Sequence, residues 1–431
     1  MSETNLPASS AATDPRDRIA SIDVLRGVAV LGILAINIWF FAFPFDIASK
    51  PILLSEYFGA DVAAWWIGWL GIEGSQRAIF TMLFGASVLL FTERLSSDER
   101  ASMLTRIYYR RTVLLILFGL INGYILLWNG DILFFYGVMG LLLFFVRKWR
   151  PRSLITAGVI IIVLLGALNF WMHFMTQAFA PIAEVAQEKL ARGESLSGQE
   201  QAAVDFIAEL PLAISSPEEL QEEIDARRAG YASAFLPNVY TTTEAYIIYG
   251  LFSLFWESLA YMMIGMAFFR LKLFDASRAT GLYVGLLIGG FAIGLSVNAW
   301  EQLQSIEQNY RTTFAVWSYD IGRMATALGY VGLVMLICKM AWLPRVRNTL
   351  AAVGKMALSN YIAQSIVCNI VFIGFGLFGQ LRFHEIYYVV FAVWAALLII
   401  SPIWLRNFRY GPLEWLWRRL TYGQPVRMRI T

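Results

Sequence analysis

The sequence has few charged residues and almost no cysteine or histidine. Asp, Glu, Lys and Arg make up 15% of its 431 residues, whereas about 25% is usual for a soluble globular chain. The net charge of +3 gives no sign of the basic face that nucleic-acid binding needs. The two cysteines are Cys338 and Cys368, both in apolar runs, and the two histidines are His173 and His384. We therefore expect no disulfide framework, no metal and no nucleic-acid partner.

Apolar side chains take the place of the missing charge. Hydrophobic residues make up 58% of the sequence and aromatic residues 15%. The apolar runs bounded by charge predict an all-α polytopic membrane protein with about ten transmembrane helices. The predicted spans are residues 19–43, 75–92, 109–128, 132–146, 153–176, 243–269, 281–300, 313–338, 350–377 and 386–405. Residues 65–71 are too short to cross, and we interpret them as an interfacial or re-entrant segment.

Lysine and arginine are unevenly distributed among the predicted loops. Because basic loops resist translocation, the side that holds most of the 34 basic residues is predicted to be cytoplasmic, and both termini lie on it. Residues 1–18 then form a disordered cytoplasmic tail, and residues 406–431 form a basic and aromatic interfacial tail. Two five-helix halves, residues 19–176 and 243–405, are joined by an acidic extracytoplasmic loop over residues 177–242.

The acidic loop and the carboxy-terminal tail each admit more than one role. The loop is a lid, a docking surface or a solvated connection. The tail alternates arginine with tryptophan, as an amphipathic interfacial helix does. Anchoring at the membrane surface is the favoured interpretation of the tail, and binding of an anionic cofactor such as coenzyme A is the alternative.

Several polar side chains occur at the outer level of the predicted spans. Ionisable groups inside a membrane are costly and tend to mark function. The residues at this level are Arg77, Asn122, Asp131, Asp320 and Arg323. Their similar depth predicts a cavity that opens outward.

A second polar set occurs at the cytoplasmic level. It comprises Asp23, Arg26, Lys355, Ser359, Asn360 and Gln364. Asp23 and Arg26 are three residues apart on one helix and can pair, either to fix that helix or to bind a ligand. Lys355, Ser359 and Asn360 have helical spacing, so we expect them on one face that points into the bundle. Glu257 lies alone between the two levels. It either donates a hydrogen bond to a neighbouring helix or serves as a relay between the two sites.

Five motifs in chain order resemble the YeiB-like family of bacterial inner-membrane proteins, whose carboxy-terminal half is a domain of unknown function. The motifs are IDVLRG at 22–27, LFG at 83–85, GDIL at 130–133, ALSNYIAQS at 357–365 and GPLEWLWR at 411–418. They cover nearly the whole chain. The resemblance implies a multi-pass protein of the bacterial inner membrane.

The first motif is also distantly similar to transmembrane acyltransferases, which are thought to pass an acyl group from cytoplasmic acyl-CoA to an acceptor on the far side. That resemblance implies a donor element at Asp23 and Arg26 and an outer site among Arg77, Asn122 and Asp131. Several YeiB-like members have a histidine where this chain has Asn122. An aspartate, Asp131 or Asp320, then has to serve as the base.

These features lead to one leading hypothesis and two alternatives. The leading hypothesis is an acyltransferase with acyl-CoA as donor and a lipid, glycan or small molecule as acceptor. Arg26 and Lys355 hold the donor, Asp131 is the acid and base, and Arg77 or Asn122 polarises the carbonyl. The first alternative is a transporter or lipid flippase, in which the same residues bind without chemistry. The second is a binding or scaffolding protein, and a homo-oligomer is compatible with all three.

Overall fold

The computed structural model describes residues 19–54, 57–93, 101–209, 216–308 and 313–430, and its elements there are helices. The predicted fold class, an all-α polytopic membrane protein, is confirmed. The long helices are α1 (Ala20–Ala42), α4 (Ser75–Thr92), α5 (Ala101–Leu120), α6 (Leu133–Val146), α7 (Pro151–Ala191), α11 (Phe255–Arg270), α12 (Thr280–Glu307), α13 (Tyr319–Lys339), α15 (Ala357–Asn369) and α16 (Ile386–Asn407). The shorter ones are α2 (Phe45–Ser49), α3 (Ala60–Ile67), α8 (Gly198–Glu209), α9 (Pro217–Arg228), α10 (Tyr231–Glu244), α14 (Pro344–Lys355) and α17 (Pro412–Tyr422). The predicted tail 1–18 lies outside the described residues.

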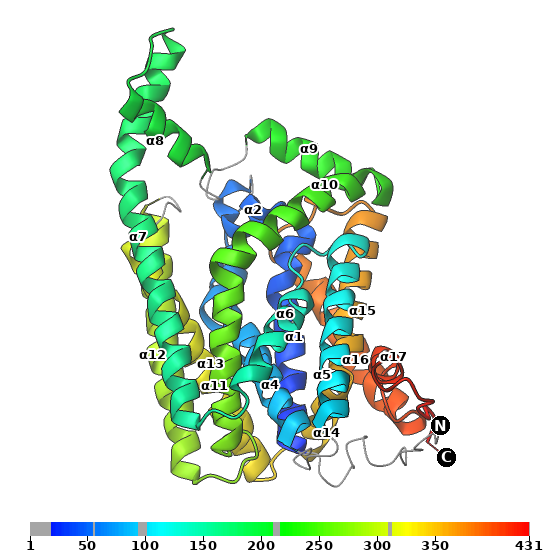
Figure 1. The fold of residues 1–431 in the computed structure, drawn as a ribbon. Coiled ribbons are helices and arrows are strands. Elements are labelled where there is room, and N and C mark those ends of the chain that lie inside the picture. The colour runs from blue at the N-terminus through cyan, green and yellow to red at the C-terminus, as the bar shows by residue number, and fades with distance from the viewer. Residues whose placement is uncertain (1–18, 55–56, 94–100, 210–215, 309–312, 431) are drawn as a thin grey trace.

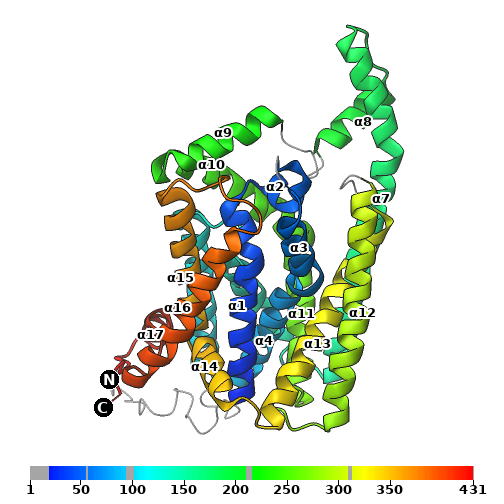
Figure 2. The same cartoon turned by 180° about the vertical axis from the view of Figure 1, so that it is seen from behind.

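The long helices stand side by side in one bundle (Figure 1). Helices α9 and α10 lie across one end, and α14 and α17 lie at the opposite end, as the reverse view also shows (Figure 2). Following the predicted topology, we call the α9 end the outer end and the α17 end the inner end. The chain enters α1 and leaves α17 at the inner end, so the start of α1 and the whole of α17 lie on the predicted cytoplasmic side (Figure 1 and Figure 2).

Seven helical stretches in the described residues are long and apolar enough to cross a membrane. They are Ala20–Ala42, Ala60–Thr92, Pro151–Ala191, Thr280–Glu307, Phe314–Lys339, Ala357–Gly374 and Ile386–Asn407. The other three predicted spans correspond to α5, α6 and α11, which stand in the same bundle (Figure 1). Because α6 has only 14 residues and a span needs about 20, the count of ten stays a prediction.

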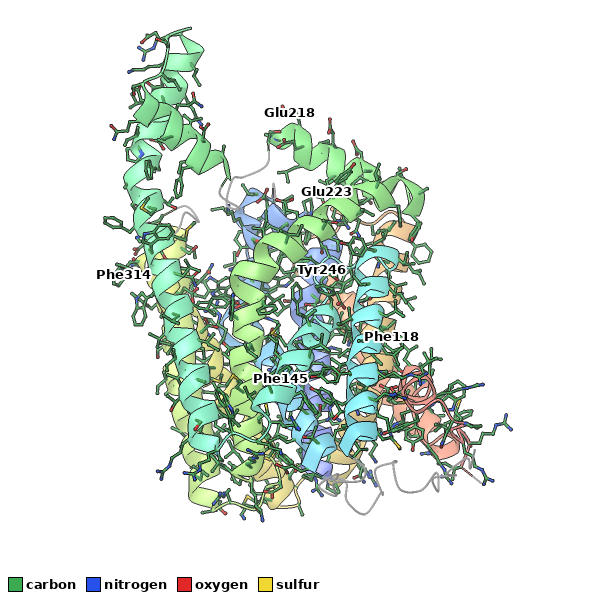
Figure 3. All side chains as sticks on the ribbon, viewed as in Figure 1. Phe118, Phe145, Glu218, Glu223, Tyr246 and Phe314 are labelled. Carbon is green, nitrogen blue, oxygen red and sulfur yellow. The ribbon has the colours of Figure 1, made fainter. Side chains whose placement is uncertain are left out.

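The flanks of the bundle are apolar, and aromatic rings are among the buried residues between its helices. Phe314, which is 52% exposed, lies on the outside of the bundle, and Phe145 on α6 is 71% exposed. Tyr246, by contrast, is buried and stacks on Phe134 with ring centroids 4.6 Å apart. Acidic side chains such as Glu218 project from α9 at the outer end (Figure 3). This distribution suits helices whose sides face lipid.

Glycines allow two pairs of helices to cross in close contact. A side chain at Gly27 of α1 would collide with the Leu350 carbonyl of α14, and one at Gly354 would collide with the Asp23 carbonyl. Gly85 of α4 and Gly265 of α11 form a second reciprocal contact. Small residues at membrane helix crossings let backbones approach closely. The glycine of the first family motif therefore brings α14 against α1.

The predicted ninth span is two helices rather than one. Helix α14 ends at Lys355, and α15 begins at Ala357, because Met356 leaves the helical conformation with φ −108° and ψ 28°. The prediction that Lys355, Ser359 and Asn360 share one helical face is therefore wrong. Lys355 ends one helix and Ser359 lies in the first turn of the next.

The predicted interfacial segment 65–71 is the first part of a broken helix. Helix α3 continues as a π-helical turn over Gly68–Ile72, and the chain then bends at Glu73 and Gly74 before α4 begins. Gly74 has φ +65°, a conformation that L side chains rarely adopt. The bend places Glu73 inside the bundle beside α13.

The predicted loop 177–242 consists of two different parts. Helix α7 continues without interruption through residue 176 to Ala191, and α8 packs against it in an arm that projects from the bundle (Figure 1). Helices α9 and α10 instead cover the outer end. Arg228 donates to the carbonyls of Phe378 (2.7 Å) and Gly379 (3.0 Å), and Tyr231 donates to the Ile125 carbonyl (2.8 Å). The second part is therefore fastened to the bundle.

Candidate functional site

A cavity of about 180 Å³ lies toward the inner end of the bundle, between α1, α4, α5, α6, α14, α15 and α17. Four basic residues, Arg26, Arg111, Lys355 and Arg418, line its inner end, and the Tyr136 and Tyr361 side chains line its deeper part. The wall between is apolar and consists largely of Phe80, Leu83, Phe84, Leu115 and Leu133. The cavity is thus basic at the predicted cytoplasmic side and apolar inside.

All five family motifs contribute to this one cavity. The first three motifs supply, in order, Arg26, then Leu83 and Phe84, then Leu133. The fourth supplies Ala357, Leu358 and Tyr361, and the fifth supplies Glu414, Trp417 and Arg418. Residues that are more than 300 positions apart in the sequence meet here because α14 crosses α1 at Gly27 and α17 docks on α5 and α15. The convergence makes this cavity the leading candidate for the functional site.

The basic residues of the cavity outnumber its acidic ones. Arg26 pairs with Asp23 at 3.0 Å. The Arg111 guanidinium lies over the Trp417 ring at 4.2 Å, and Trp417 Nε1 donates to the Arg111 carbonyl at 2.9 Å. Within the part of the chain that the structure describes, Arg111, Lys355 and Arg418 have no carboxylate partner. Four cations thus face two carboxyl groups, those of Asp23 and Glu414, and this excess of positive charge favours an anionic ligand.

Glu414 attaches α17 to the start of α15. Its Oε1 accepts the backbone N–H groups of Leu358 (2.7 Å) and Ser359 (3.1 Å), and its Oε2 accepts the Ser359 hydroxyl. A carboxylate at a helix N-terminus satisfies free N–H groups and complements the helix dipole. Burial nevertheless raises the pKa of Glu414 above its usual range. The predicted surface anchor is therefore also a wall of the cavity.

The deep part of the cavity adjoins the Asp131 carboxylate. The Tyr361 hydroxyl accepts Trp128 Nε1 at 3.0 Å and the Ile132 backbone N–H at 3.3 Å. Asp131 is fully buried, with Asn122 Nδ2 donating to Oδ1 (2.8 Å) and the Phe134 N–H donating to Oδ2 (2.8 Å). The π-helical turn Ile121–Ile125 carries Asn122, whose own Oδ1 is buried without a partner.

Two predicted donor-site residues brace helices instead. Asn360 Nδ2 donates to the Val353 carbonyl at 3.0 Å and to the Ser401 hydroxyl at 3.2 Å. Gln364 Nε2 donates to the Val30 carbonyl at 3.1 Å. Both residues are buried and neither lines the cavity. Of the predicted cytoplasmic set, the structure therefore brings Arg26 and Lys355 to the cavity wall, with Asp23 behind Arg26.

The predicted outer residues fall into two groups. Asn122 and Asp131 lie beside the cavity, as described above. Arg77, Asp320 and Arg323 instead belong to a cluster of ion pairs, which also contains Glu257, the residue expected to be alone. Arg77 Nη1 lies 2.8 Å from Glu257 Oε2, Arg323 Nε lies 2.7 Å from Glu73 Oε2, and Asp320 accepts the Tyr261 hydroxyl at 2.8 Å.

The sequence did not predict the pairing of His384 with Asp61 near the outer end. Asp61 of α3 is fully buried and accepts His384 Nδ1 at 2.6 Å and the His384 backbone N–H at 2.9 Å. It also accepts Arg382 Nη2 at 2.6 Å. Asp61 lies outside the predicted spans, so the sequence predicted no buried acid there, and its basic partners Arg382 and His384 were the only sequence signal for one.

Fold and cavity together define a class, the polytopic helical membrane proteins with a basic, amphipathic cavity at one end. Residues 268–424 match the family described as protein of unknown function (DUF418). The chain is 28% identical over 430 residues to the uncharacterized protein YxaH of Bacillus subtilis (strain 168), covering 95% of this chain and 96% of that protein. It is 29% identical over 429 residues to the uncharacterized protein YeiB of Escherichia coli (strain K12), covering 94% and 96%.

These similarities confirm the resemblance to the YeiB-like family: the carboxy-terminal part of the chain matches DUF418, and YxaH and YeiB are similar to it over nearly their whole length. Its homologues are bacterial. No solved structure matches the chain.

Proposed function

We propose that this protein transfers an acyl group from a cytoplasmic acyl-CoA to a hydroxyl or amine acceptor reached from the outer side of the bacterial inner membrane. The observation that carries the proposal is the cavity, where an excess of cations at the inner end leads into an apolar interior that ends beside Asp131. An acyl-CoA has the matching form, with phosphates at one end and an acyl chain at the other.

The size of the cavity fixes how a donor would bind. Pockets that enclose a drug-sized ligand measure about 300–1,000 Å³, and this one measures about 180 Å³. The cavity has room for an acyl chain and for part of the segment that links this chain to the nucleotide of coenzyme A. The nucleotide itself would stay at the protein surface. Lys355, which is exposed, and Arg418 on α17 are in place to meet phosphates there.

The proposed reaction assigns separate roles to residues of this chain. The acceptor oxygen or nitrogen forms a bond to the acyl carbon as the C–S bond breaks, and the CoA thiolate leaves to the cytoplasmic side and takes a proton from water. Asp131 accepts the acceptor's proton as general base. Asn122, hydrogen-bonded to Asp131, polarises the carbonyl in place of Arg77, which is engaged with Glu257.

Release of CoA thiol by the purified protein in lipid nanodiscs tests this proposal. With acyl-CoA and bacterial polar lipid as acceptor, we expect Asp131→Asn to lower the rate by about 10²–10⁴-fold. Lys355→Ala and Arg418→Ala should each weaken acyl-CoA binding by about tenfold or more, because each removes a charged contact. Arg419→Ala is the matched control, since Arg419 is an exposed arginine of the same helix that does not line the cavity. Equal activity in Asp131→Asn and the unaltered protein would contradict the proposal.

A second candidate function, transport, is favoured by the broken helix. Discontinuous helices near the middle of a membrane are typical of transporter binding sites, and α3 and α4 meet at such a break at Glu73 and Gly74. The same nanodisc assay separates the two functions. Binding of an anionic amphiphile without any release of thiol, followed by its movement between leaflets, would favour transport.

A further inference from the structure

The outer half of the bundle contains a buried cluster of four carboxylates and two guanidinium groups. The bend before α4 supplies Glu73, α4 supplies Arg77, α11 supplies Glu257, α12 supplies Glu301, and α13 supplies Asp320 and Arg323. We call these six residues the outer cluster. It is separate from the Asp131 group, and the proposed reaction assigns none of its members a role.

Arg323 is at the centre of one half of the outer cluster. Its side chain is 0% exposed, its Nε donates to Glu73 Oε2 at 2.7 Å, and its Nη1 donates to Glu301 and to Asn298 Oδ1, the latter at 3.1 Å. Two carboxylates therefore share one guanidinium group. Its Nη2 is buried without a hydrogen-bond partner.

Arg77 joins the other half to this one. Its Nη1 donates to Glu257 Oε2 at 2.8 Å and its Nη2 donates to the Tyr319 hydroxyl at 3.4 Å. The Tyr319 hydroxyl in turn donates to Glu73 Oε1 at 2.8 Å. Asp320 accepts the Tyr261 hydroxyl at 2.8 Å and is repelled by the nearby Glu257 carboxylate. Hydrogen bonds and ion pairs thus join five of the six residues into one network, and Asp320 lies beside it as a further acid.

The charges of the outer cluster do not balance. The charged groups that face its members from α4, α11, α12 and α13 are the members themselves, within the ranges that the structure describes. From α6, which packs on α4 and α11, the Tyr136 hydroxyl also faces Arg77 and Glu257, and it is neutral. The nearby polar residues Tyr261, Tyr319 and Asn298 are neutral. With every acid ionised, four negative charges would face two positive ones. Buried charge inside a membrane is costly unless it is neutralised, so the cluster requires two further positive charges.

A second observation also points to a missing positive charge. Glu257 is only 3% exposed, and its Oε1 is buried without a hydrogen-bond partner. A free oxygen on an ionised and buried carboxylate is unfavourable, and a proton removes the charge. A metal ion is the less suitable neutraliser, because no group of three or more acidic, histidine or cysteine side chains could hold one among the described residues.

We propose that the outer cluster is a proton-binding site that holds two protons at neutral pH, chiefly on Glu257 and Asp320, and exchanges them with the outer side. Glu73 and Glu301 both contact Arg323, whereas Glu257 and Asp320 do not. Glu257 meets Arg77 through Oε2 only, which leaves its buried Oε1 to carry the proton. Exchange is feasible because the Arg77 and Glu73 side chains are 21% and 15% exposed while the others are nearly fully buried.

A use for these protons follows if the proposed function holds. Acyl transfer releases the acceptor's proton on the outer side, and the cluster can take it up. A hydrogen-bonded chain also ties the cluster to the cavity, since the Thr81 hydroxyl donates to the Arg77 carbonyl at 2.7 Å and bonds the Tyr136 hydroxyl in the cavity wall. Only this use rests on the proposed function. Proton binding itself does not.

Infrared spectroscopy of the full chain in lipid nanodiscs tests the inference without any activity assay. We expect a carbonyl stretching band of protonated carboxyl groups at pH 7 that shifts in heavy water. Glu257→Gln and Asp320→Asn should each remove a comparable share of this band, and the double variant should remove both shares. Glu218→Gln, an exposed acid of α9, is the matched control and should leave the band unchanged.

Thermal unfolding provides a second measurement for variants that keep the fold. Because deprotonation would leave two uncompensated negative charges, the Tm of the unaltered protein should fall as the pH rises from 6 to 9. The double variant Glu257→Gln and Asp320→Asn should lose most of this dependence. An infrared band that both single variants leave intact would overturn the inference. So would a Tm at pH 8 that sodium ions restore, because that result would identify a cation as the neutraliser.

Discussion

Gly27 lies where α1 and α14 cross, and a side chain there would meet the backbone of Leu350. We predict that Gly27→Leu separates the two helices and lowers the free energy of unfolding by about 1–3 kcal/mol, the usual cost of overpacking. Because Lys355 follows this crossing directly, acyl-CoA binding should weaken as well. The readouts are Tm in nanodiscs and acyl-CoA affinity.

Gly285 on α12 is the matched control for that substitution. It is also a helical glycine of a predicted span, but nothing lies within 4 Å of a side chain placed there. Gly285→Leu should leave Tm and affinity unchanged. An equal loss in both variants would show that the effect comes from helix or lipid properties and not from the α1 and α14 crossing.

Asp61 is the second residue whose surroundings give a definite expectation. Asp61→Asn keeps the size of the side chain but removes the charge that His384 and Arg382 contact. Hydrogen bonds to a charged group contribute about 1.5–3 kcal/mol each to stability, so a Tm decrease is expected. Asp225→Asn, on the exposed side of α9, should have little effect. A Tm for Asp61→Asn equal to that of Asp225→Asn would show that the contacts of Asp61 with His384 and Arg382 do not stabilise the fold.

The candidate site was predicted from the sequence only in part, and the reason is visible residue by residue. Arg26 and Lys355 stood out because each interrupts an apolar run. Arg111 and Arg418 did not, since they occur in basic segments that the topology rule already explains. Asn360 and Gln364 stood out for the same reason as Lys355, yet their hydrogen bonds go to the backbones of neighbouring helices. A polar residue inside a predicted span therefore indicates a buried side chain, but it does not show whether that side chain binds a ligand or a neighbouring helix.

At the scale of elements, α17 is the wall of the cavity whose attachment depends on one ionisable group. Burial raises the pKa of Glu414, so the docked state binds the proton more tightly than the undocked state does. The stabilisation is therefore complete below the usual glutamate pKa of about 4.3 and is lost as the pH rises through the raised value. We predict that α17 is held more firmly at pH 5 than at pH 8.

Hydrogen exchange measures this attachment. The protection factors of the backbone amides in residues 412–422 should be larger at pH 5 than at pH 8 in the unaltered protein. Glu414→Gln keeps an oxygen acceptor for the Leu358 N–H but has no charge, so its protection should not depend on pH. Glu219→Gln on α9 is the control and should retain the difference. Protection that is the same at both pH values in the unaltered protein would argue against this attachment.

Helix boundaries were predictable where charge or apolar periodicity marks them. Helix α4 has the predicted bounds, 75–92, and α6 and α16 lie within two residues of theirs. The break at Met356 was not predictable, because no proline or charge run marks it in the sequence. The continuation of α7 beyond residue 176 was missed because its polarity increases while its helical conformation persists.

At the scale of the whole molecule, the two levels carry opposite charge imbalances. At the inner cavity four basic side chains face two carboxyl groups, and in the outer cluster four carboxyl groups face two guanidinium groups. An anionic donor at the inner end and protons at the outer end would neutralise both. The low net charge of +3 gives no sign of these opposite imbalances, because they arise only where the fold brings the charged residues together.

The measurement that tests the account most directly is a density map of the full chain in nanodiscs with a thioether analogue of acyl-CoA, which cannot release its chain. We predict density for phosphates between Lys355 and Arg418 and for an acyl chain that passes Phe84 and ends beside Tyr361 and Asp131. The Lys355→Ala and Arg418→Ala double variant should show neither. An analogue bound elsewhere, or a cavity that stays without density at saturating concentration, would contradict the central claim.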